Sequence, residues 1–436
     1  MNIKEYLWAT TRLLAPLVVG SILFTQALAD GLDLRVYWAA AKEFVSGGNL
    51  YAPGLPGTPY GGMAFTYPPF AAAVLAPLAS LPVQTALVLQ TMFNLLMAFV
   101  VGAAITSYLN RHRVLRAPNR WTQYVLTSMF ICGVLLLSAP WRNSLTLGQI
   151  NPLLMALIVV DLLVVSPRHP NGVLPSGILT GIAAGIKLTP LVFLMFFIIR
   201  GDWKGALRLA GTFAATAVLM AWVTPSLSIQ YWGSALQDTN RVGTLSRFEN
   251  ISLRGFIARL NLEPSVANGL WILASGTIVL LGAVAVYRLR RQEDTWAPAA
   301  VTALVMLLIS PVSWGHHWVW VVVVVAALLG RHAHATVGQP FRWRGFFTSP
   351  PGILAVLLAL AFALQPPEAA KLAGSPQPYA EISTLSQIAA EAGLFVAVIV
   401  IGWFAVAAIP DPPTGRPKYS RHKLQASGKG PMAAES

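Results

Sequence analysis

The chain has 436 residues, of which 56% are hydrophobic and 11% are charged, and its mean hydropathy is +0.62. Ordinary soluble proteins carry about 25% charged residues, so a water-soluble domain could not cover this much apolar surface. The formal net charge is +14, and the basic residues fall in short runs between apolar segments. This pattern suits orientation in an anionic bilayer and argues against a nucleic-acid-binding protein.

Apolar stretches recur along the whole chain, and a hydrocarbon core of about 30 Å needs about 20 such residues per helix. They predict an all-α polytopic membrane protein with about eleven to thirteen transmembrane helices. The predicted spans are 12–29, 80–108, 121–138, 151–165, 176–200, 206–223, 268–287, 297–310, 318–330, 351–364 and 388–409. We expect residues 1–410 to form a single transmembrane domain, and residues 411–436 to form a disordered basic tail.

The basic residues mark one side of the membrane. They cluster in RHRVLRAPNR (111–120), RGDWKGALR (200–208), YRLRRQED (287–294), RHAHATVGQPFRWR (331–344) and the tail. The positive-inside rule places these segments in the cytoplasm. The opposite connections hold Gly, Pro, aromatic and isolated polar residues; they are 30–67, 139–150, 187–190, 224–267, 311–317 and 365–387. We therefore expect the functional site on the external face.

One predicted span does not fit this alternation, because both flanks of 176–200 should be cytoplasmic. The motif GIKLTP (185–190) offers a reason. Pro190 lacks an amide hydrogen and disturbs the preceding turn, so two half-length helices are expected to meet near Lys187 on the external side. Broken helices at membrane depth are tolerated where they line a cavity.

Two acids, Asp30 and Asp33, directly follow the first span. The apolar and polar residues after Asp33 separate onto two faces of a short helix, which predicts an amphipathic helix lying at the membrane surface. One interpretation makes Asp33 the N-cap of that helix, worth roughly 1 kcal/mol. The other makes its carboxylate a general base that faces a sugar hydroxyl.

The stretch WRNSLTLGQINP (141–152) places Arg142, Gln149 and Asn151 between two apolar spans. Arg142 is the only formal charge in that connection. A charge at mid-bilayer costs about 2.5–3.5 kcal/mol on insertion scales, and a bound phosphate or carboxylate would offset this cost. These three residues are therefore candidates for binding a substrate.

Lys187 raises the same question, because apolar helices flank it on both sides. A lysine in that position is a functional candidate, and the alternative is a side chain that extends to the membrane interface. Tyr67 lies in a Gly- and Pro-rich loop and offers a stacking surface for a sugar or a lipid, or simply packs the loop.

Connection 224–267 carries a basic excess on the side that the positive-inside rule leaves poor in charge. Arg254 is therefore a candidate for holding an anionic ligand, although a solvated loop face explains the charge equally well. Asn250-Ile251-Ser252 also matches an N-glycosylation sequon.

His316 and His317 lie at the external mouth of two spans, among several tryptophans. Neighbouring helical side chains point about 100° apart, so the two rings are not expected to bind one metal ion together. Binding a phosphate or a sugar hydroxyl is the expected role of one or both. We expect Trp320 to belong to the interfacial tryptophan belt.

Five motifs occur in one order: DLRVYWAA (33–40), YPP (67–69), GQINPLL (148–154), GIKLTP (185–190) and SPVSWGHHWVW (310–320). Together they resemble glycosyltransferase family 87, whose members are membrane mannosyltransferases with the GT-C fold. The resemblance covers most of residues 20–330. It makes residues 1–410 a catalytic domain of GT-C architecture.

The resemblance implies polyprenyl-phosphate mannose as donor. It implies a phosphatidylinositol mannoside as acceptor of an α-1,2-linked mannose, or alternatively a lipomannan or lipoarabinomannan to be branched. It also implies Asp33 as the catalytic base, with Asp30 as a rival, and roles in the site for Lys187, His316 and His317. The external connections lack the Asp-x-Asp pair common in nucleotide-sugar enzymes, so neither a metal ion nor another cofactor is expected.

A transporter is the main alternative from another class, ahead of a non-catalytic scaffold or a lipid flippase. A transporter of the common type would carry two repeats with paired broken helices. The sequence shows one break and no convincing internal repeat.

Overall fold

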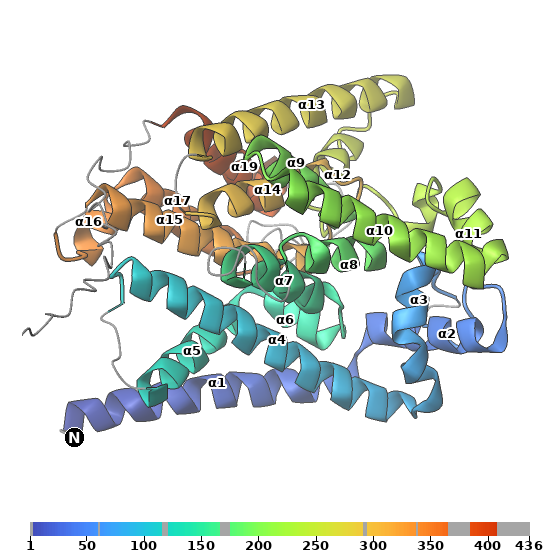
Figure 1. The fold of residues 1–436 in the computed structure, drawn as a ribbon, viewed down its shortest axis with the longest axis horizontal. Coiled ribbons are helices and arrows are strands. Elements are labelled where there is room, and N and C mark those ends of the chain that lie inside the picture. The colour runs from blue at the N-terminus through green and yellow to red at the C-terminus, as the bar shows by residue number, and fades with distance from the viewer. Residues whose placement is uncertain are drawn as a thin grey trace, which may run out of the picture.

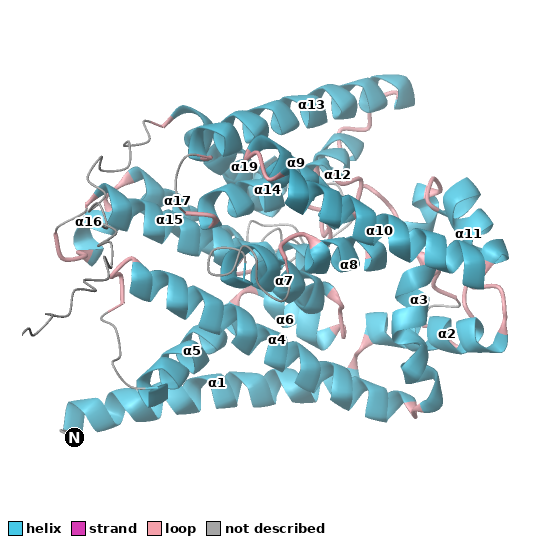
Figure 2. Cartoon of the chain, viewed as in Figure 1, coloured by secondary structure: helices cyan, strands magenta, loops and turns pink. Residues whose placement is uncertain are grey.

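The computed structural model describes residues 3–59, 62–115, 121–165, 175–290, 294–336, 339–364 and 384–407. Throughout these ranges the regular elements are helices, with no strand among them, so the predicted all-α fold is confirmed (Figure 2). The predicted tail 411–436 and most of the connection 365–387 lie outside the described residues.

Long helices set the main direction of the molecule (Figure 1). They are α1 (Ile3–Ala29), α4 (Val83–Arg111), α5 (Trp121–Leu137), α10 (Trp203–Val223), α13 (Pro264–Leu289), η6 (Gly315–Trp320) running into α15 (Val321–Ala335), and α19 (Thr384–Val406). Within the described ranges, five helices are long and apolar enough to cross a bilayer alone. The number rises to seven if two bent pairs each form one span: α1 with α2 (Leu32–Ser46), and α5 with α6 (Ala139–Thr146).

Shorter apolar helices occupy the other predicted spans. They are α7 (Asn151–Val159) continued by η2 (Val160–Val165), α8 (Ile178–Ile186), η3 (Thr189–Val192), α9 (Phe193–Ile199), α14 (Trp296–Ile309) and α17 (Pro350–Ala361). At 1.5 Å per residue, α14 is only about 21 Å long, less than the hydrocarbon thickness of about 30 Å. The expected eleven to thirteen spans therefore require these short helices to lie in the bilayer beside the long ones, and that count stays a prediction.

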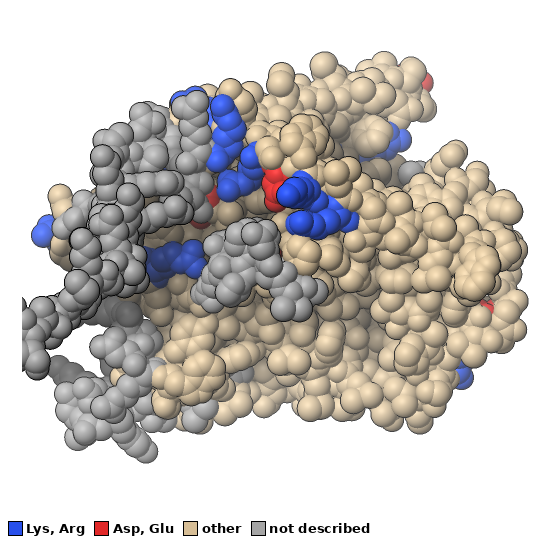
Figure 3. Space-filling view, in the orientation of Figure 1, with Lys and Arg blue, Asp and Glu red and all other residues tan. Residues whose placement is uncertain are grey.

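The two sets of connections lie at opposite ends of the helices. Figure 1 shows α2, α3 (Pro69–Leu75) and α11 (Pro225–Gln230) at one end, and the N-terminus and α16 (Trp343–Phe347) at the other. On the face drawn in Figure 3, Lys and Arg gather near the beginning of α10 and are nearly absent over the rest of α10 and over α11. There α10 exposes apolar side chains such as Val218 and Trp222, as a lipid-facing helix does.

The predicted break in the fifth span is confirmed. α8 ends at Ile186, Lys187 has extended backbone angles, and η3 begins two residues later with Pro190 at its second position. At the far end of α8, Gly177 packs so closely on Gly205 that an added Cβ would meet the Gly205 carbonyl oxygen at 2.3 Å. Because Gly205 lies in the first turn of α10, both flanks of the broken segment return to the same end of the molecule.

Two carboxylates cap the helices at that end. Asp161 accepts hydrogen bonds from the Gly177 amide at 2.9 Å, the Thr180 amide at 2.8 Å and the Thr180 hydroxyl at 2.7 Å. Asp202 likewise accepts from the Gly205 amide at 2.8 Å. Each carboxylate satisfies amides that have no partner inside their helix, at the end where the helix dipole is positive. The base of the half-helix α8 is thereby fixed against α7 and α10.

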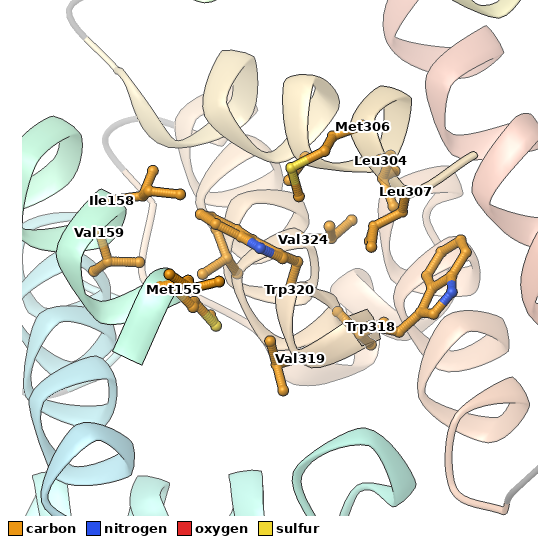
Figure 4. Close-up of a cluster of buried hydrophobic side chains, with 14 of the residues drawn as sticks. Met155, Ile158, Val159, Leu304, Met306, Leu307, Trp318, Val319, Trp320 and Val324 are labelled. Atoms are coloured by element: carbon orange, nitrogen blue, oxygen red, sulfur yellow. The ribbon is translucent and has the colours of Figure 1, made fainter. Parts of the chain in front are cut away.

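The core lies around α14 and the η6–α15 segment, where Figure 4 shows Trp320 and Val324 beside Met306 and Leu307. Trp320 is only 3% exposed, and its ring centroid lies 5.5 Å from that of Phe193. The expectation that Trp320 belongs to an interfacial belt is therefore wrong. The η6–α15 segment is a central element, so this face of the helix meets other helices instead of lipid.

Replacement of Gly177 tests the packing of the broken segment. Gly177→Ala should lower the unfolding temperature in detergent, because Gly177 has φ 101° and a Cβ would collide with backbone. The matched variant Gly211→Ala, on α10 with open space around the new Cβ, should be neutral or slightly stabilising. Equal effects of the two variants, measured by thermal unfolding, would contradict the described packing.

Candidate active site

The backbone of the turn after α6 caps the beginning of α2. The Gly31 amide donates to the Thr146 carbonyl at 2.9 Å, and the Asp33 and Leu34 amides donate to the Leu147 carbonyl at 2.9 and 3.1 Å. Gly31 supports this turn with φ 57°, and the helix has no side-chain cap. The interpretation of Asp33 as an N-cap is therefore wrong, and its carboxylate is left available for other contacts.

Close packing of the same turn brings Gln149 to the carboxylate. Gly148 has φ 70°, and an added Cβ would lie 2.7 Å from the Leu34 Cβ, so only glycine fits here. The Gln149 side chain makes a hydrogen bond to the Asp33 carboxylate. The second carboxylate oxygen, Oδ2, is buried without a hydrogen-bond partner among the described residues. An unpaired carboxylate oxygen is able to accept a proton from a substrate hydroxyl.

Gln149 is the centre of a polar network between α2, α4 and α7. Its Oε1 accepts hydrogen bonds from the Tyr37 hydroxyl and from Asn151 Nδ2, both at 3.0 Å. Its backbone carbonyl accepts from Asn94 Nδ2 at 3.0 Å. The Tyr37 hydroxyl also lies 3.0 Å from the Tyr67 hydroxyl. These bonds leave the Gln149 amide nitrogen to face Asp33.

Lys187 joins this network from the break between α8 and η3. Its Nζ donates to Asn151 Oδ1 at 3.1 Å and lies 3.0 Å from His317 Nε2. The same atom lies 5.5 Å from the Tyr67 ring centroid and interacts electrostatically with Asp33. The side chain therefore turns into the protein, and the alternative in which it extends to the membrane interface is wrong.

The two neighbouring histidines have different surroundings. His317 contacts Lys187, whereas His316 contributes its carbonyl, which accepts from Ser144 Oγ at 3.1 Å and Asn151 Nδ2 at 3.3 Å. The His316 Nε2 atom is buried without a hydrogen-bond partner among the described residues. The two ring centroids lie 4.8 Å apart, and the ring planes are inclined by 78° to each other.

The electrostatics of Asp33 favour a proton acceptor that works near neutral pH. Asp33 lies on the 15-residue helix α2, which bends 52° away from α1 and which we treat as a surface helix outside the spans. Burial raises the pKa of this carboxyl to about 6, although the Gln149 hydrogen bond and the Lys187 charge act in the opposite direction. A general base is most effective when its pKa lies near the working pH.

Lys187 also lines a cavity of about 390 Å³, a volume that includes the open space at its mouth. Its polar end includes Asn151, Lys187 and His317. Its other walls are mostly apolar, and Figure 4 shows several of them: Ile158, Met306, Leu307, Val319 and Trp320. Asp33 is not among the residues that line this cavity.

Three predicted candidates lie away from the network. Arg142 donates to the carbonyls of Leu137 and, at 3.0 Å, Ala363, and so ties α6 to the ends of neighbouring helices. Arg254, on α12 (Leu253–Ala258), places its guanidinium 4.6 Å from the Trp271 ring centroid. Asp30 is exposed, so the structure brings Asp33 and not its rival into contact with Gln149.

Sequence reasoning gave no role to two polar residues of α4. Gln90 Nε2 and Asn94 Nδ2 both donate to the Gln149 carbonyl, at 3.3 and 3.0 Å. They also pair with each other, as residues four apart on a helix can. The sequence did contain a feature that could have indicated them, namely two amide side chains on one face of an apolar helix. Polar side chains in membrane helices are costly unless they find partners.

A buried carboxylate and an inward-facing ammonium are joined by amide side chains at one end of an all-helical bundle. They define a polytopic membrane protein with a candidate site for group transfer. Comparison with known proteins identifies its family. The chain belongs to glycosyltransferase family 87, whose model matches residues 65–311. No solved structure matches the chain.

Curated relatives agree with this assignment. The chain is 32% identical, over 75% of its length and 78% of the relative, to a protein of Mycobacterium tuberculosis named polyprenol-phosphate-mannose-dependent alpha-(1-2)-phosphatidylinositol mannoside mannosyltransferase. A protein of the same name from Mycolicibacterium smegmatis is 35% identical over 68% of the chain and 70% of the relative. A second M. smegmatis protein, named as the corresponding pentamannoside mannosyltransferase, is 30% identical over 69% of the chain and 70% of the relative.

The Asp33 carboxylate should lower the stability of the fold. Its pKa is raised on folding, so the native state loses stability as pH rises from about 4 to about 6, where the buried group ionises. Asp33→Asn should therefore raise unfolding free energy at pH 7.5 by about 1 kcal/mol, a value reduced for partial exposure. Thermal unfolding of Asp33→Asn against the exposed control Asp30→Asn checks this, and a destabilised Asp33→Asn protein would contradict it.

Proposed function

We propose that this protein is a mannosyltransferase that moves mannose from polyprenyl-phosphate mannose to a phosphatidylinositol mannoside. The names of its relatives state this donor, this acceptor class and an α-1,2 linkage. The observation that carries the proposal is the shared network of Asp33 and Lys187, which offers a base and a cation to one reaction.

The reaction is a single displacement with inversion. The acceptor's 2-hydroxyl oxygen forms a bond to the anomeric carbon of mannose while the bond from that carbon to the donor phosphate oxygen breaks. The hydroxyl proton passes to Asp33, whose Oδ2 has no competing hydrogen bond among the described residues. The products are the mannosylated acceptor and polyprenyl phosphate, and the carboxylic acid then returns its proton to water.

Lys187 acts on the opposite side of the reacting carbon. The leaving phosphate is already an anion, so it needs no strong acid, but the charge that builds up on its oxygen needs a positive partner. The Lys187 ammonium, held by Asn151 and His317, supplies this charge beside the cavity. The apolar walls of that cavity suit the first carbons of an isoprenoid chain. We propose that these groups suffice and that no metal ion takes part.

We propose that the reaction takes place on the external face of the plasma membrane and that the carboxyl-terminal tail lies in the cytoplasm. Two observations support this orientation. The network lies near α2, at the end of the bundle opposite the basic connections (Figure 1). The positive-inside rule assigns such basic connections to the cytoplasm.

A transfer assay on the purified full-length protein in lipid nanodiscs tests the proposal. With radiolabelled polyprenyl-phosphate mannose, a set of phosphatidylinositol mannosides and EDTA throughout, wild-type protein should form an α-1,2-linked product. Asp33→Asn should lower kcat by about 100-fold or more, the usual contribution of a general base. Below about pH 6, kcat/KM should fall nearly tenfold per pH unit as Asp33 becomes protonated.

The exposed residues Asp30 and Lys42 provide controls on the same segment. Asp30→Asn and Lys42→Gln should retain the wild-type rate within about twofold, since solvent screens the charges of exposed side chains. Wild-type activity in Asp33→Asn would remove the base assignment. Product formation only after addition of Mg²⁺ or Mn²⁺ would remove the metal-independent mechanism, and transfer only to unbranched lipomannan would replace the acceptor.

A further inference from the structure

A single buried amide side chain, Asn250, clamps the turn that precedes His317. The Ser313 amide donates to Asn250 Oδ1 at 2.9 Å, and Asn250 Nδ2 donates to the Pro311 carbonyl at 3.3 Å. These two bonds grip the backbone on either side of Val312. The Asn250 side chain is 0% exposed, and the Pro311 carbonyl also accepts from Ser252 Oγ at 3.2 Å. Loss of the Asn250 side chain would therefore leave the buried Ser313 amide without its partner.

The clamped residue, Val312, fixes the ring of His317. Its carbonyl accepts hydrogen bonds from the His317 ring and, at 2.9 Å, from Ser310 Oγ. Because His317 Nε2 faces Lys187 Nζ at 3.0 Å, the ring nitrogen that donates to Val312 is Nδ1. A proton held on Nδ1 leaves Nε2 as an acceptor, and partners of this kind are what set the tautomer and orientation of a functional histidine.

The clamp is itself anchored to the last described helix. The Ile251 amide donates to the Ser313 carbonyl at 2.8 Å, and Arg259 Nη2 donates to the Asn250 carbonyl at 3.2 Å. Arg259 forms an ion pair with Glu391 of α19, and both side chains are nearly inaccessible. A buried ion pair is costly to break on one side, so it holds the backbone of Asn250 in one place.

We propose that Asn250 is a positioning residue that acts through His317. By gripping the turn around Val312, it keeps the His317 proton on Nδ1, and Nε2 then holds the Lys187 ammonium toward the donor phosphate. This inference rests on the proposed function, in which Lys187 stabilises the leaving phosphate. Asn250 is fully buried, so the sequon Asn250-Ile251-Ser252 is not accessible to glycosylation in the folded protein.

A double-mutant cycle of Asn250→Ala and His317→Ala tests the proposal in the nanodisc assay. Asn250→Ala alone should lower kcat about tenfold with little change in the donor KM, because the interaction lost is one made to the departing phosphate. In the His317→Ala background, the same substitution should lower kcat by less than about twofold, since residues that act through one another are not additive. The control Asn268→Ala, at an exposed position on α13, should leave kcat unchanged.

Losses that multiply in the double variant would overturn the proposal, because a structural role would weaken the enzyme whether or not His317 is present. If Asn250→Ala is not monodisperse, Ser310→Ala removes the second donor to the Val312 carbonyl and enters the same cycle. It should lower kcat about threefold in the wild-type background and leave it unchanged beside His317→Ala. Absence of transfer by wild-type protein would overturn the proposed function, whereas wild-type transfer with multiplying losses would overturn this inference alone.

Discussion

The ammonium of Lys187 is held inside the protein at the break between α8 and η3, which we call the hairpin. The partners of this ammonium and the two ends of α8 depend on its position. A charged amine near hydrocarbon must find partners, and Asn151 and His317 provide them. Reaching those partners requires α8 to stop at Ile186, which the extended backbone of Lys187 and the following Pro190 achieve. At its other end α8 is fixed by the Asp161 carboxylate. The hairpin therefore places one positive charge at a defined depth.

The second charge of the site, the Asp33 carboxylate, depends on a different set of hydrogen bonds. The Leu147 carbonyl caps α2, so the Asp33 side chain does not have to. Gln149 then approaches one side of the carboxylate because Gly148 allows the turn to pack tightly against Leu34. Base and cation thus come from two separately built turns that meet through the Gln149 and Asn151 amides. The amides fix the distance between the charges without neutralising either one.

The sequence predicted the features that depend on local chemistry. The break at Pro190, the importance of Lys187 and the short helix after Asp33 follow from proline geometry, isolated charge and hydrophobic periodicity. The sequence alone did not show whether Asp33 or Asp30 is the better candidate for the base. The Leu147 carbonyl caps α2 in place of the Asp33 side chain, and it belongs to a turn far away in the sequence. The sequence also suggested a substrate-binding role for Arg142, because it does not show that the distant Ala363 carbonyl accepts a hydrogen bond from this side chain.

For Arg142, the sequence shows a charge beside an apolar span. The structure shows that carbonyls of Leu137 and Ala363, at the ends of other segments, accept its hydrogen bonds. The sequence could not predict that Trp320 is buried. Tryptophans near the ends of spans usually face the membrane interface, and Trp320 is buried because α14 packs against it. The clamp of Asn250 on the 311–313 turn is equally long-range.

The most direct measurement is a cryo-electron microscopy structure of the Asp33→Asn variant in nanodiscs with polyprenyl-phosphate mannose bound. We expect a donor phosphate oxygen within about 3 Å of Lys187 Nζ, the distance of a charge-assisted hydrogen bond, with the anomeric carbon facing the side chain at position 33. A phosphate bound away from Lys187, or a mannose whose anomeric carbon faces away from position 33, would contradict it.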